Sequence, residues 1–358
     1  MKGVAVPLFS LRTEDDFGIG EFADLPKLGD WCVANNLKII QILPINDTTA
    51  HFDWRDSYPY NAISAFALNP VYLNINTLLS ITPNASIDSQ GNDITALGAM
   101  QKRLNKNTFV DYPKVLKAKW KYFQIAFEQQ WETLKNSYGF QQFVKENKDW
   151  LPDYAQYCAE RDGNGTEIHL FLQYHCDKQL REAVKALHDK GILLKGDIPI
   201  GVNPSGVDVK SHPDLFNLDV QVGAPPDDFA AEGQNWGFPS YNWEAMAKDN
   251  YAWWQRRLQV MARYFDAYRI DHILGFFRIW EIPKTAKSGL LGHFSPALPL
   301  SEEEIENQGF RFIKSKHVKK GVDTLFISDP NEKDKYIPRI ELQKTKVYQT
   351  DRDRKSVV

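Results

Sequence analysis

Short apolar runs alternate with helix-like segments in the first part of the chain. The runs at residues 3–11 and 37–44 predict two buried strands, and residues 24–35 between them place apolar side chains on one face of a helix. A strand, a helix and a second strand with short connections indicate a βαβ unit and hence a parallel sheet.

The same alternation continues to residue 283. Residues 191–202 and 267–272 predict a third and a fourth buried strand, and residues 167–190 and 249–265 predict the helices before them. Residues 82–165 are rich in Lys, Glu, Gln and Trp at helical spacing, so we interpret them as a helical insertion. After residue 283 the pattern weakens, and no further barrel strand is predicted.

Two long loops interrupt this pattern. Residues 45–70 follow the second predicted strand, and residues 223–243 form an aromatic segment punctuated by Pro and Gly. Loops longer than about 15 residues in a compact domain are usually functional. In a β/α barrel the loops after the strands build the active-site face, so we expect site residues in both segments.

The composition is that of a soluble globular protein. The chain has 358 residues, 43% of them hydrophobic and 25% charged, with a net charge of -3, which gives no electrostatic reason to bind nucleic acid or an anionic membrane. No apolar run approaches the roughly 20 residues that span a bilayer. No Gly-rich phosphate loop follows the first strand, which excludes a nucleotide-binding domain.

The three cysteines are scattered and odd in number. Cys32, Cys158 and Cys176 therefore predict buried thiols in a reducing compartment, the cytoplasm, and neither a disulfide framework nor a zinc site. We expect no metal and no cofactor.

Arg269 and Asp271 lie two apart in the fourth predicted strand, so their side chains point to the same side. A buried ion pair adds little stability, which argues against an ordinary core position. A guanidinium favours the ionised form of a neighbouring carboxylate, and an ionised Asp at the end of a barrel strand suits a glycosidic nucleophile. A structural Arg–Asp pair is the alternative. Asp197, inside the third apolar strand, is either a hydrogen-bond hub or a site residue.

Aromatic residues make up 13% of the chain, and some of them cluster with polar residues. Such faces suit sugar rings, although core packing is the alternative. The clusters are Phe52, Trp54, Tyr58 and Tyr60, and Phe229, Trp236, Phe238, Tyr241 and Trp243.

Several separate segments, in order, carry a resemblance to a known family. They are GVAVPLFSLRTEDDFGIGEF, QILPINDTT, DSYPYNAISAFALNP, KGDIPIGVNPSGVDV, GAPPDDFAAEGQNWGFPSYNW and AYRIDHILGFFRIWEIP. Together they resemble the amylomaltases, or disproportionating enzymes, which are 4-α-glucanotransferases of glycoside hydrolase family 77. The segment GHFSPALPL and the residues after it are similar to the branch with a long insertion after the fourth barrel strand.

The resemblance implies a TIM-type (β/α)8 barrel, of which about the first half is present, with a helical insertion. It also implies retaining transfer of α-1,4-glucan segments between maltooligosaccharides. Asp271 would be the nucleophile and Arg269 would position it. The resemblance implies these substrate-binding residues: Tyr58, Tyr60, Asp197, Asp228, Phe229, Gln234, Trp236 and His272.

The second carboxyl that retention requires is missing from the expected place. In the family the acid/base Glu lies on the fifth strand in a motif like AEDLG, which this sequence lacks. Glu281 is too close to Asp271 along the chain to be this Glu. The acidic run at 302–306 is typical of a solvent-exposed surface segment and not of a buried strand. We therefore expect this chain by itself to have negligible activity. A hydrolase of the same clan and a non-catalytic glucan-binding fragment remain alternatives.

The expected organisation is based on these motifs. Residues 1–81 begin the barrel, 82–165 form the insertion, 166–285 carry the third and fourth strands with the covering loop and nucleophile, and 286–352 form an extension. Residues 353–358 are expected to be a non-native tail, because DRKSVV can be back-translated into a common sequencing-adapter sequence.

Overall fold

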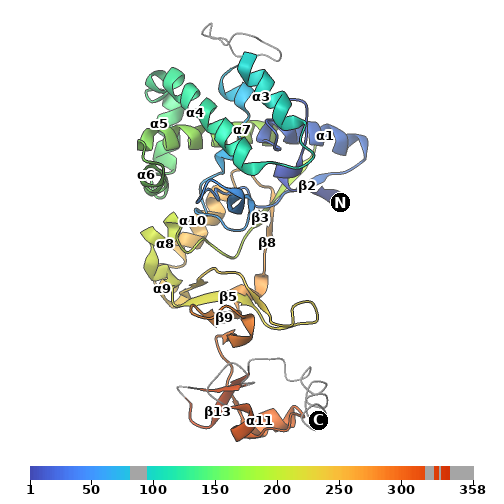
Figure 1. Ribbon diagram of the computed structural model, residues 1–358, viewed down its shortest axis with the longest axis vertical. Helices are drawn as coiled ribbons and strands as arrows, with labels where there is room; N and C mark the ends of the chain where they lie inside the picture. Colours follow the sequence, from blue (N-terminus) through green and yellow to red (C-terminus); the bar gives the residue numbers. More distant parts are fainter. Residues whose placement is uncertain (81–94, 319–325, 330–331, 339–358) are drawn as a thin grey trace. The chain divides into compact units, whose positions relative to one another are not determined.

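The computed structural model describes residues 1–80, 95–318, 326–329 and 332–338 (Figure 1). The chain divides into two compact units. The first comprises Met1–His212 and Glu244–Asp271, and the second Pro213–Trp243 and His272–Val358. The tail at 353–358 and residues 82–94 of the predicted insertion lie outside the described residues.

A four-stranded parallel sheet forms the centre of the first unit. Its strand order follows the chain order, so every neighbouring pair is joined by a crossover connection, as the predicted βαβ pattern requires. The strands are β1 (Gly3–Ala5), β2 (Ile39–Gln41), β3 (Leu193–Ile198) and β8 (Ala267–Ile270).

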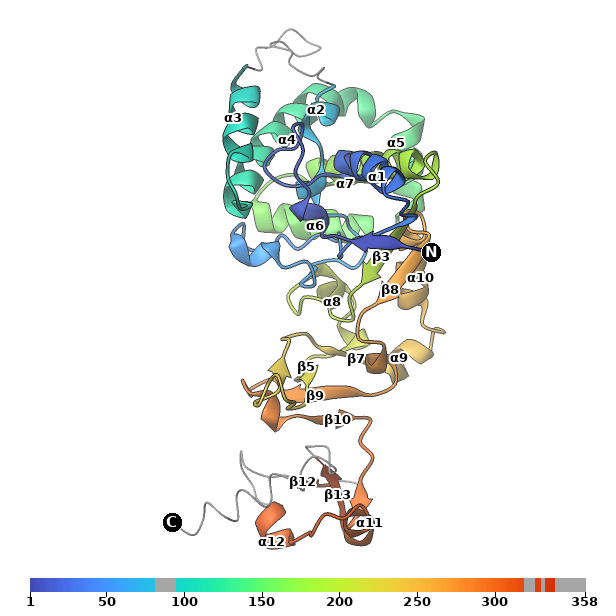
Figure 2. The same cartoon turned by 90° about the vertical axis from the view of Figure 1, so that its right-hand side faces the viewer.

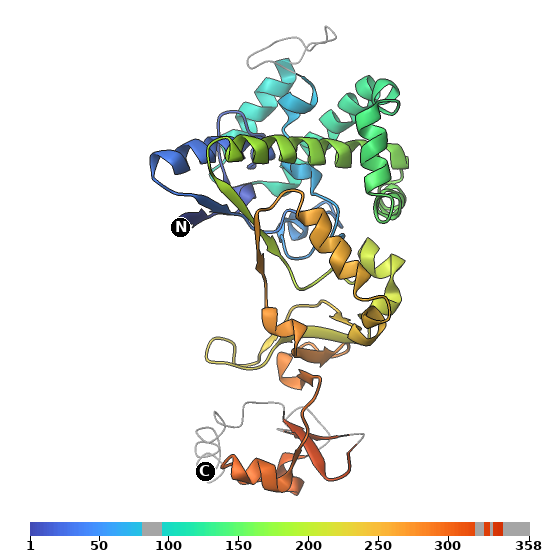
Figure 3. The ribbon, with the colours of Figure 1, turned by 180° about the vertical axis from the view of Figure 1, so that it is seen from behind.

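Helices cover one face of this sheet. In β3, Leu194, Gly196 and Ile198 are buried, whereas Leu193 on the other face is 37% exposed. Gly196 is required at its position, because a Cβ atom there would lie 2.4 Å from the ring of Phe265. The long helix α7 runs beside the strands (Figure 3). The helices next to the strands are α1 (Leu25–Ala34), α7 (Thr166–His188) and α10 (Ala252–Met261).

The described part of the predicted insertion is helical, as expected. It consists of α3 (Thr95–Asn105), α4 (Tyr112–Leu134), α5 (Tyr138–Glu146) and α6 (Leu151–Asp162). Shorter helices are α2 (Ile75–Leu78), α8 (Val207–Ser211) and α9 (Trp243–Ala247). The 3-10 helices are η1 (Leu8–Ser10), η2 (Phe22–Asp24), η3 (Trp54–Ser57), η4 (Pro70–Tyr72), η5 (Pro213–Leu215), η6 (Ile273–Phe276) and η7 (Gly289–Leu291).

The second unit contains short antiparallel sheets. Figure 2 shows β5, β9 and β10 as neighbouring strands. The first sheet has the order β10 (His293–Ser295), β9 (Ile279–Pro283), β5 (Val220–Ala224) and β6 (Gln234–Asn235), and β4 (Phe216–Asn217) pairs with β7 (Ser240–Tyr241). A third sheet has the order β11 (Leu300–Ser301), β13 (Lys335–Pro338) and β12 (Phe326–Ser328), next to α11 (Glu302–Asn307) and α12 (Lys314–His317).

Three expectations about the strands need correction. The first strand ends at Ala5 and not at residue 11, because Pro7 lacks a backbone N–H and a 3-10 turn follows. Neither β1 nor β8 is buried as predicted, since among the described strands each has one neighbour in the sheet. The aromatic segment 223–243 is not all loop, because it contributes β6 and β7 to antiparallel pairs.

No helix in the described part of the chain is long and apolar enough to cross a membrane.

A fully buried ion pair ties the insertion to the barrel. The Lys119 ammonium on α4 binds the Glu21 carboxylate and also donates to the carbonyl oxygens of Val71, at 2.6 Å, and Leu73, at 2.8 Å. Asn74 donates to the second oxygen of Glu21 at 2.6 Å. Burial raises the pKa of Glu21 to about 7, against the opposing charge of Lys119. All three N–H groups of the Lys119 ammonium therefore have a hydrogen-bond acceptor, although neither side chain of the pair is exposed to solvent.

We predict that Lys119→Met lowers the free energy of unfolding by about 3–5 kcal/mol at pH 8, because it leaves the Glu21 carboxylate buried without its cation. The loss should be smaller at pH 5. Lys119 opposes the rise in the pKa of Glu21, so that pKa rises further in the folded variant. A folded pKa above the unfolded one means that stability is lost as the pH rises, so the variant loses more than the unaltered chain between pH 5 and pH 8. Urea unfolding at both pH values measures the difference.

Two variants test this explanation. Glu21→Gln combined with Lys119→Met should recover most of the loss, because it removes the unpaired charge. Lys185→Met, which breaks an exposed pair with Asp189, should change stability by no more than about 0.5 kcal/mol. An equal loss at pH 5 and pH 8 would contradict the ionic explanation.

Candidate active site

One arginine gathers the polar groups at the carboxyl ends of β3 and β8. The Nη1 atom of Arg269 donates to Asp197 Oδ2 at 2.5 Å and to the Tyr60 hydroxyl at 3.1 Å, and its Nη2 atom donates to Asp271 Oδ1 at 2.6 Å. Tyr60 in turn donates to Asp197 Oδ2 at 2.8 Å. Asp197 and Arg269 are register partners on adjacent parallel strands, so their side chains leave the same face of the sheet.

The two carboxylates differ in their access to solvent. The Asp197 side chain is fully buried, whereas those of Asp271 and Arg269 are 28% and 40% exposed. Burial raises the pKa of Asp197, and the hydrogen bond from Tyr60 and the charge of Arg269 oppose this rise. Asp271 is therefore accessible to solvent, whereas Asp197 contacts Arg269 from the buried side.

The charges of this cluster hold Arg269 and Tyr60 protonated. Partial burial lowers the pKa of Arg269, but the hydrogen bond with Tyr60 and the charges of Asp197 and Asp271 outweigh it, so the net shift is upward. Burial and the contact with Asp197 raise the pKa of Tyr60 to about 12. Tyr60 is thus a stable hydrogen-bond donor to Asp197 at neutral pH.

The two carboxylate oxygens of Asp197 differ in their hydrogen bonds. Within the described residues its Oδ1 atom is buried and has no hydrogen-bond partner, while its Oδ2 atom accepts two bonds. A buried acceptor without a partner is costly. The sequence alternatives for Asp197 were a hub and a site residue, and the geometry places it in direct contact with the Arg269 that binds Asp271.

Tyr58 lies beside this cluster. Its ring is 54% exposed and its centroid is 5.6 Å from that of Tyr60. Burial and then the charge of Asp271 raise the pKa of Tyr58, so its hydroxyl is within electrostatic reach of that carboxylate. The structure thus brings together five of the predicted site residues: Tyr58, Tyr60, Asp197, Arg269 and Asp271.

The other five belong to the second unit. There the ring centroids of Trp236 and His272 are 5.0 Å apart, and Trp236 Nε1 donates to Gln234 Oε1 at 2.9 Å. Asp228 and Phe229 are exposed on the segment between β5 and β6, and Phe229 is almost wholly accessible.

The backbone at the end of β8 is unusual. The Asp271 amide still bonds to the Ile198 carbonyl oxygen at 3.0 Å, but His272 adopts a left-handed conformation with a φ of 50°. Non-glycine residues rarely adopt this conformation, and here it turns the chain immediately after the carboxylate. Asp271 therefore stands directly after Ile270, the last residue of β8.

Buried carboxylates shape the loop that carries Tyr58 and Tyr60. Asp56 accepts the amides of His51, at 3.0 Å, and Phe52, at 2.7 Å, which closes the turn around η3. Asp47 accepts the Thr49 amide at 2.9 Å and the Tyr154 hydroxyl at 2.7 Å. Sequence reasoning missed both, although an Asp in a turn-forming polar loop is the signal that could have indicated them.

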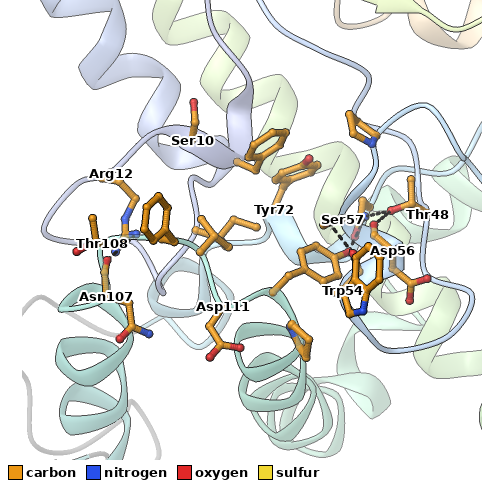
Figure 4. A pocket seen from close by; sticks show the side chains of 18 of the residues that line it. Ser10, Arg12, Thr48, Trp54, Asp56, Ser57, Tyr72, Asn107, Thr108 and Asp111 are labelled. Atoms are coloured by element: carbon orange, nitrogen blue, oxygen red, sulfur yellow. Dashed lines mark hydrogen bonds between the residues drawn. The ribbon is translucent and has the colours of Figure 1, made fainter. Parts of the chain in front are cut away.

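The loop also forms one wall of a cavity of about 1030 Å³ in the first unit (Figure 4). Trp54, which is 72% exposed, lies on its rim, and none of the ten predicted site residues lines it. The lining combines aromatic rings with hydroxyl, amide and carboxylate groups, among them Ser10, Arg12, Thr48, Trp54, Asp56, Ser57, Tyr72, Asn107, Thr108, Phe109 and Asp111.

Glu281 and the acidic run at 302–306, the other carboxylates discussed in the sequence analysis, make contacts within their own secondary structure or with a neighbouring strand. Glu281 lies in β9, where it accepts a hydrogen bond from the Ser240 hydroxyl. The acidic run at 302–306 forms α11, with Glu304 in a capping box. The described residues contain no cluster of three or more His, Cys, Asp or Glu side chains suited to a metal ion.

A parallel β/α sheet with polar side chains gathered at the carboxyl ends of its strands is the architecture of β/α-barrel enzymes, among them glycoside hydrolases. The family described as 4-alpha-glucanotransferase, glycoside hydrolase family 77, matches residues 6–168 and 160–347. The chain belongs to this family, which confirms the resemblance found in the sequence.

Individual relatives agree. The chain is 44% identical over 338 residues to the 4-alpha-glucanotransferase DPE2 of Oryza sativa subsp. japonica, a match that covers 86% of this chain and 35% of that protein. It is 34% identical over 325 residues to the 4-alpha-glucanotransferase of Chlamydia muridarum, covering 83% of this chain and 59% of that one. The chain therefore spans between about a third and three-fifths of the length of these relatives.

Solved structures confirm the fold class over the part that this chain shares with them. The amylomaltase of Corynebacterium glutamicum superposes with a TM-score of 0.70 at 24% identity, over 82% of this chain and 43% of that one. The amylomaltase of Streptococcus agalactiae in complex with acarbose superposes with a TM-score of 0.68 at 27% identity. This match covers 82% of this chain and 63% of that one. The fold is that of the first strands of a TIM-type α/β barrel with a helical insertion.

We predict that Arg269→Gln lowers the melting temperature more at pH 7.5 than at pH 4. Without the guanidinium, the already raised pKa of Asp197 rises further in the folded chain. A folded pKa above the unfolded one means that stability is lost as the pH rises, so the variant suffers most where the carboxylate is ionised. Thermal unfolding followed by circular dichroism measures the effect.

Arg55→Gln is the matched control, since it removes an arginine from an exposed pair with Asp53. It should leave the melting temperature nearly unchanged at both pH values. If Arg269→Gln lowers the melting temperature equally at pH 4 and pH 7.5, the charge of Arg269 does not stabilise the carboxylates around it, and the explanation is wrong.

Proposed function

We propose that this chain carries the nucleophile part of a 4-alpha-glucanotransferase, which transfers α-1,4-glucan segments between maltooligosaccharides by a retaining double displacement. The observation that carries the proposal is the position of Asp271, partly exposed at the end of β8 and bound to Arg269. The family relatives named 4-alpha-glucanotransferase support the same activity.

In this mechanism an Asp271 oxygen attacks the anomeric carbon of the donor while the bond to the leaving 4-oxygen breaks. Arg269 binds one oxygen of the carboxylate and fixes its orientation, which leaves the other oxygen for the attack. The 4-hydroxyl of the acceptor then displaces Asp271 from the glycosyl unit and loses its proton. The leaving oxygen must gain a proton, and we assign no residue of this chain to that transfer.

The same interpretation assigns the substrate-binding residues. Tyr58 offers an exposed aromatic face beside Asp271, and Tyr60 and Asp197 support Arg269 from the buried side. In the second unit the exposed ring of Phe229 and the neighbouring rings of Trp236 and His272 suit a sugar. The proposed substrate-binding residues are Tyr58, Tyr60, Asp197, Asp228, Phe229, Gln234, Trp236 and His272.

We further propose a division of the chain by role. Residues 1–81 begin the barrel, 82–165 form the insertion, 166–285 carry the nucleophile and 286–352 are an extension. The three cysteines, all free and buried, support a cytoplasmic location, where thiols stay reduced.

A glucan-binding role without turnover is the second candidate. The absence of an assigned acid/base residue favours it for this chain alone, because binding needs the aromatic and polar surfaces only. A glucan hydrolase of the same clan would use the same nucleophile, and it differs only in that water accepts the glycosyl unit.

The nucleophile can be tested with α-maltotriosyl fluoride, since fluoride leaves without being protonated. We expect the folded chain to form a covalent maltotriosyl adduct on the peptide that contains Asp271, visible by intact-mass and peptide mass spectrometry. Asp271→Asn should form none, whereas Asp189→Asn, at an exposed surface pair, should react like the unaltered chain.

Maltotriose separates the candidate functions. This chain alone should give no product ladder, because the natural leaving group needs a proton donor. A ladder of glucose and longer maltooligosaccharides from this chain would mean that the acid/base residue lies within it. An adduct that persists in Asp271→Asn would refute Asp271 as the nucleophile.

We also propose that the cavity beside the loop binds glucan, because Trp54 offers an exposed aromatic face next to amide, hydroxyl and carboxylate groups. Trp54→Ala should weaken maltoheptaose binding about tenfold, or ~1.4 kcal/mol, in isothermal titration calorimetry. Trp31→Ala, at an accessible ring on α1 outside the cavity, should not change the affinity. Equal weakening by both variants would contradict a site at Trp54.

A further inference from the structure

Two further buried charged side chains, Asp208 and Arg257, lie outside the residues assigned above. Asp208 on α8 and Arg257 on α10 are 5% and 1% exposed. The positive charge of Arg257 acts on Asp208. Neither side chain is accessible to a substrate, so any influence on the reaction must pass through the groups that they hold.

Asp208 holds the loop that carries Tyr60. Its Oδ2 atom accepts the Ala65 amide at 2.6 Å. The same stretch is fastened by two backbone bonds of 2.9 Å, from Asn203 to the Ala62 carbonyl oxygen and from Val207 to that of Ile63. These three bonds begin two residues after Tyr60, so they fix where its side chain leaves the loop.

Gly206 permits this close approach. A Cβ atom at that position would lie 2.5 Å from the Ile63 carbonyl oxygen, a distance that real Cβ atoms do not show. The segment that contains Asp208 and the loop are thus packed backbone to backbone, and a shift of one moves the other.

Arg257 holds the exit of β3. Its Nη2 atom donates to the Pro199 carbonyl oxygen at 2.9 Å, two residues after Asp197. The guanidinium lies 4.7 Å from the ring centroid of Trp254 and 5.6 Å from that of Trp253. Arg257 belongs to α10, the helix that leads into β8 and Arg269.

The two residues therefore hold segments of the elements that supply the cluster. Asp208 holds the loop with Tyr60, and Arg257, on the helix before Arg269, holds the exit of the strand with Asp197. We propose that Asp208 and Arg257 are positioning residues, which hold Tyr60 and Asp197 in contact with Arg269. The catalytic meaning of this contact rests on the proposed function, whereas the contact itself does not.

A neutral side chain could accept the Ala65 amide without the cost of burying a charge. Burial raises the pKa of Asp208 to about 7, and the Ala65 bond and the charge of Arg257 partly offset this rise. The Ala65 amide by itself does not require a charged acceptor at this position.

The contact between Tyr60 and Asp197 can be measured through the pKa of the phenol at position 60. 3-Fluorotyrosine is placed at position 60 of the full chain, and its phenol is titrated by fluorine NMR. Fluorine lowers the phenol pKa, which brings the titration into a range where the chain stays folded. Burial and Asp197 raise the pKa of Tyr60, so loss of the contact lowers it.

Asp208→Asn keeps an acceptor for Ala65 but loses the charge, and Asp208→Ala loses both. We expect the pKa at position 60 to fall by about one unit or more in Asp208→Ala and by less in Asp208→Asn. Glu21→Gln is the matched control, because Glu21 is another buried carboxylate whose pKa burial raises to about 7, and it binds Lys119 on α4. It should destabilise the chain but leave this titration unchanged.

An unchanged titration in folded Asp208→Ala would overturn the proposal, and so would an equal shift in Glu21→Gln. If Asp208→Ala does not fold by circular dichroism, the comparison of Asp208→Asn with Glu21→Gln decides in the same way. The fluoride adduct of the unaltered chain reports separately on the proposed function, so the two failures can be told apart.

Discussion

The candidate site depends on one guanidinium that serves two carboxylates. Asp197 is fully buried, and a buried carboxylate is tolerated only when a cation and hydrogen bonds compensate for lost water. Arg269 supplies that cation and uses its other terminal nitrogen for Asp271. Because the guanidinium is a planar and rigid fork, fixing Asp197 on one side fixes the direction in which Asp271 is held on the other. The orientation of the accessible carboxylate is thus set by the one that a substrate cannot reach.

Parallel strand register makes this arrangement possible. Arg269 and Asp197 are 72 residues apart in the chain, and Tyr60 is 137 residues from Asp197, yet the three meet at one end of the sheet. Adjacent parallel strands end at the same edge, so loops that follow different strands converge there. The left-handed backbone at His272 turns the chain directly after Asp271, which follows the last residue of β8 and so stays at that edge.

Buried polar groups tie the loops and the insertion to one another and to neighbouring helices. Lys119 joins α4 to Glu21, Asp47 joins the long loop to Tyr154, and Asp208 joins the same loop to α8. An apolar contact tolerates small slips, but a buried donor or acceptor that loses its partner costs free energy at once. Such pairs therefore select one arrangement of segments that share no regular secondary structure, which is the accuracy that a site built on loops requires.

The sequence by itself determined the order of the four parallel strands and of the helices between them, because apolar runs and helical periodicity report which residues avoid water. It did not indicate the short antiparallel strands of the second unit. It also indicated Arg269 and Asp271 as a pair, since a separation of two in a strand is a local geometric fact. Only the tertiary structure decided that Tyr60 meets Asp197, that Asp208 and Arg257 lie behind them, and that Trp54 borders a cavity. It also decided that β1 and β8 are short and partly exposed. These features depend on which distant segments pack together, and neither periodicity nor spacing carries that information.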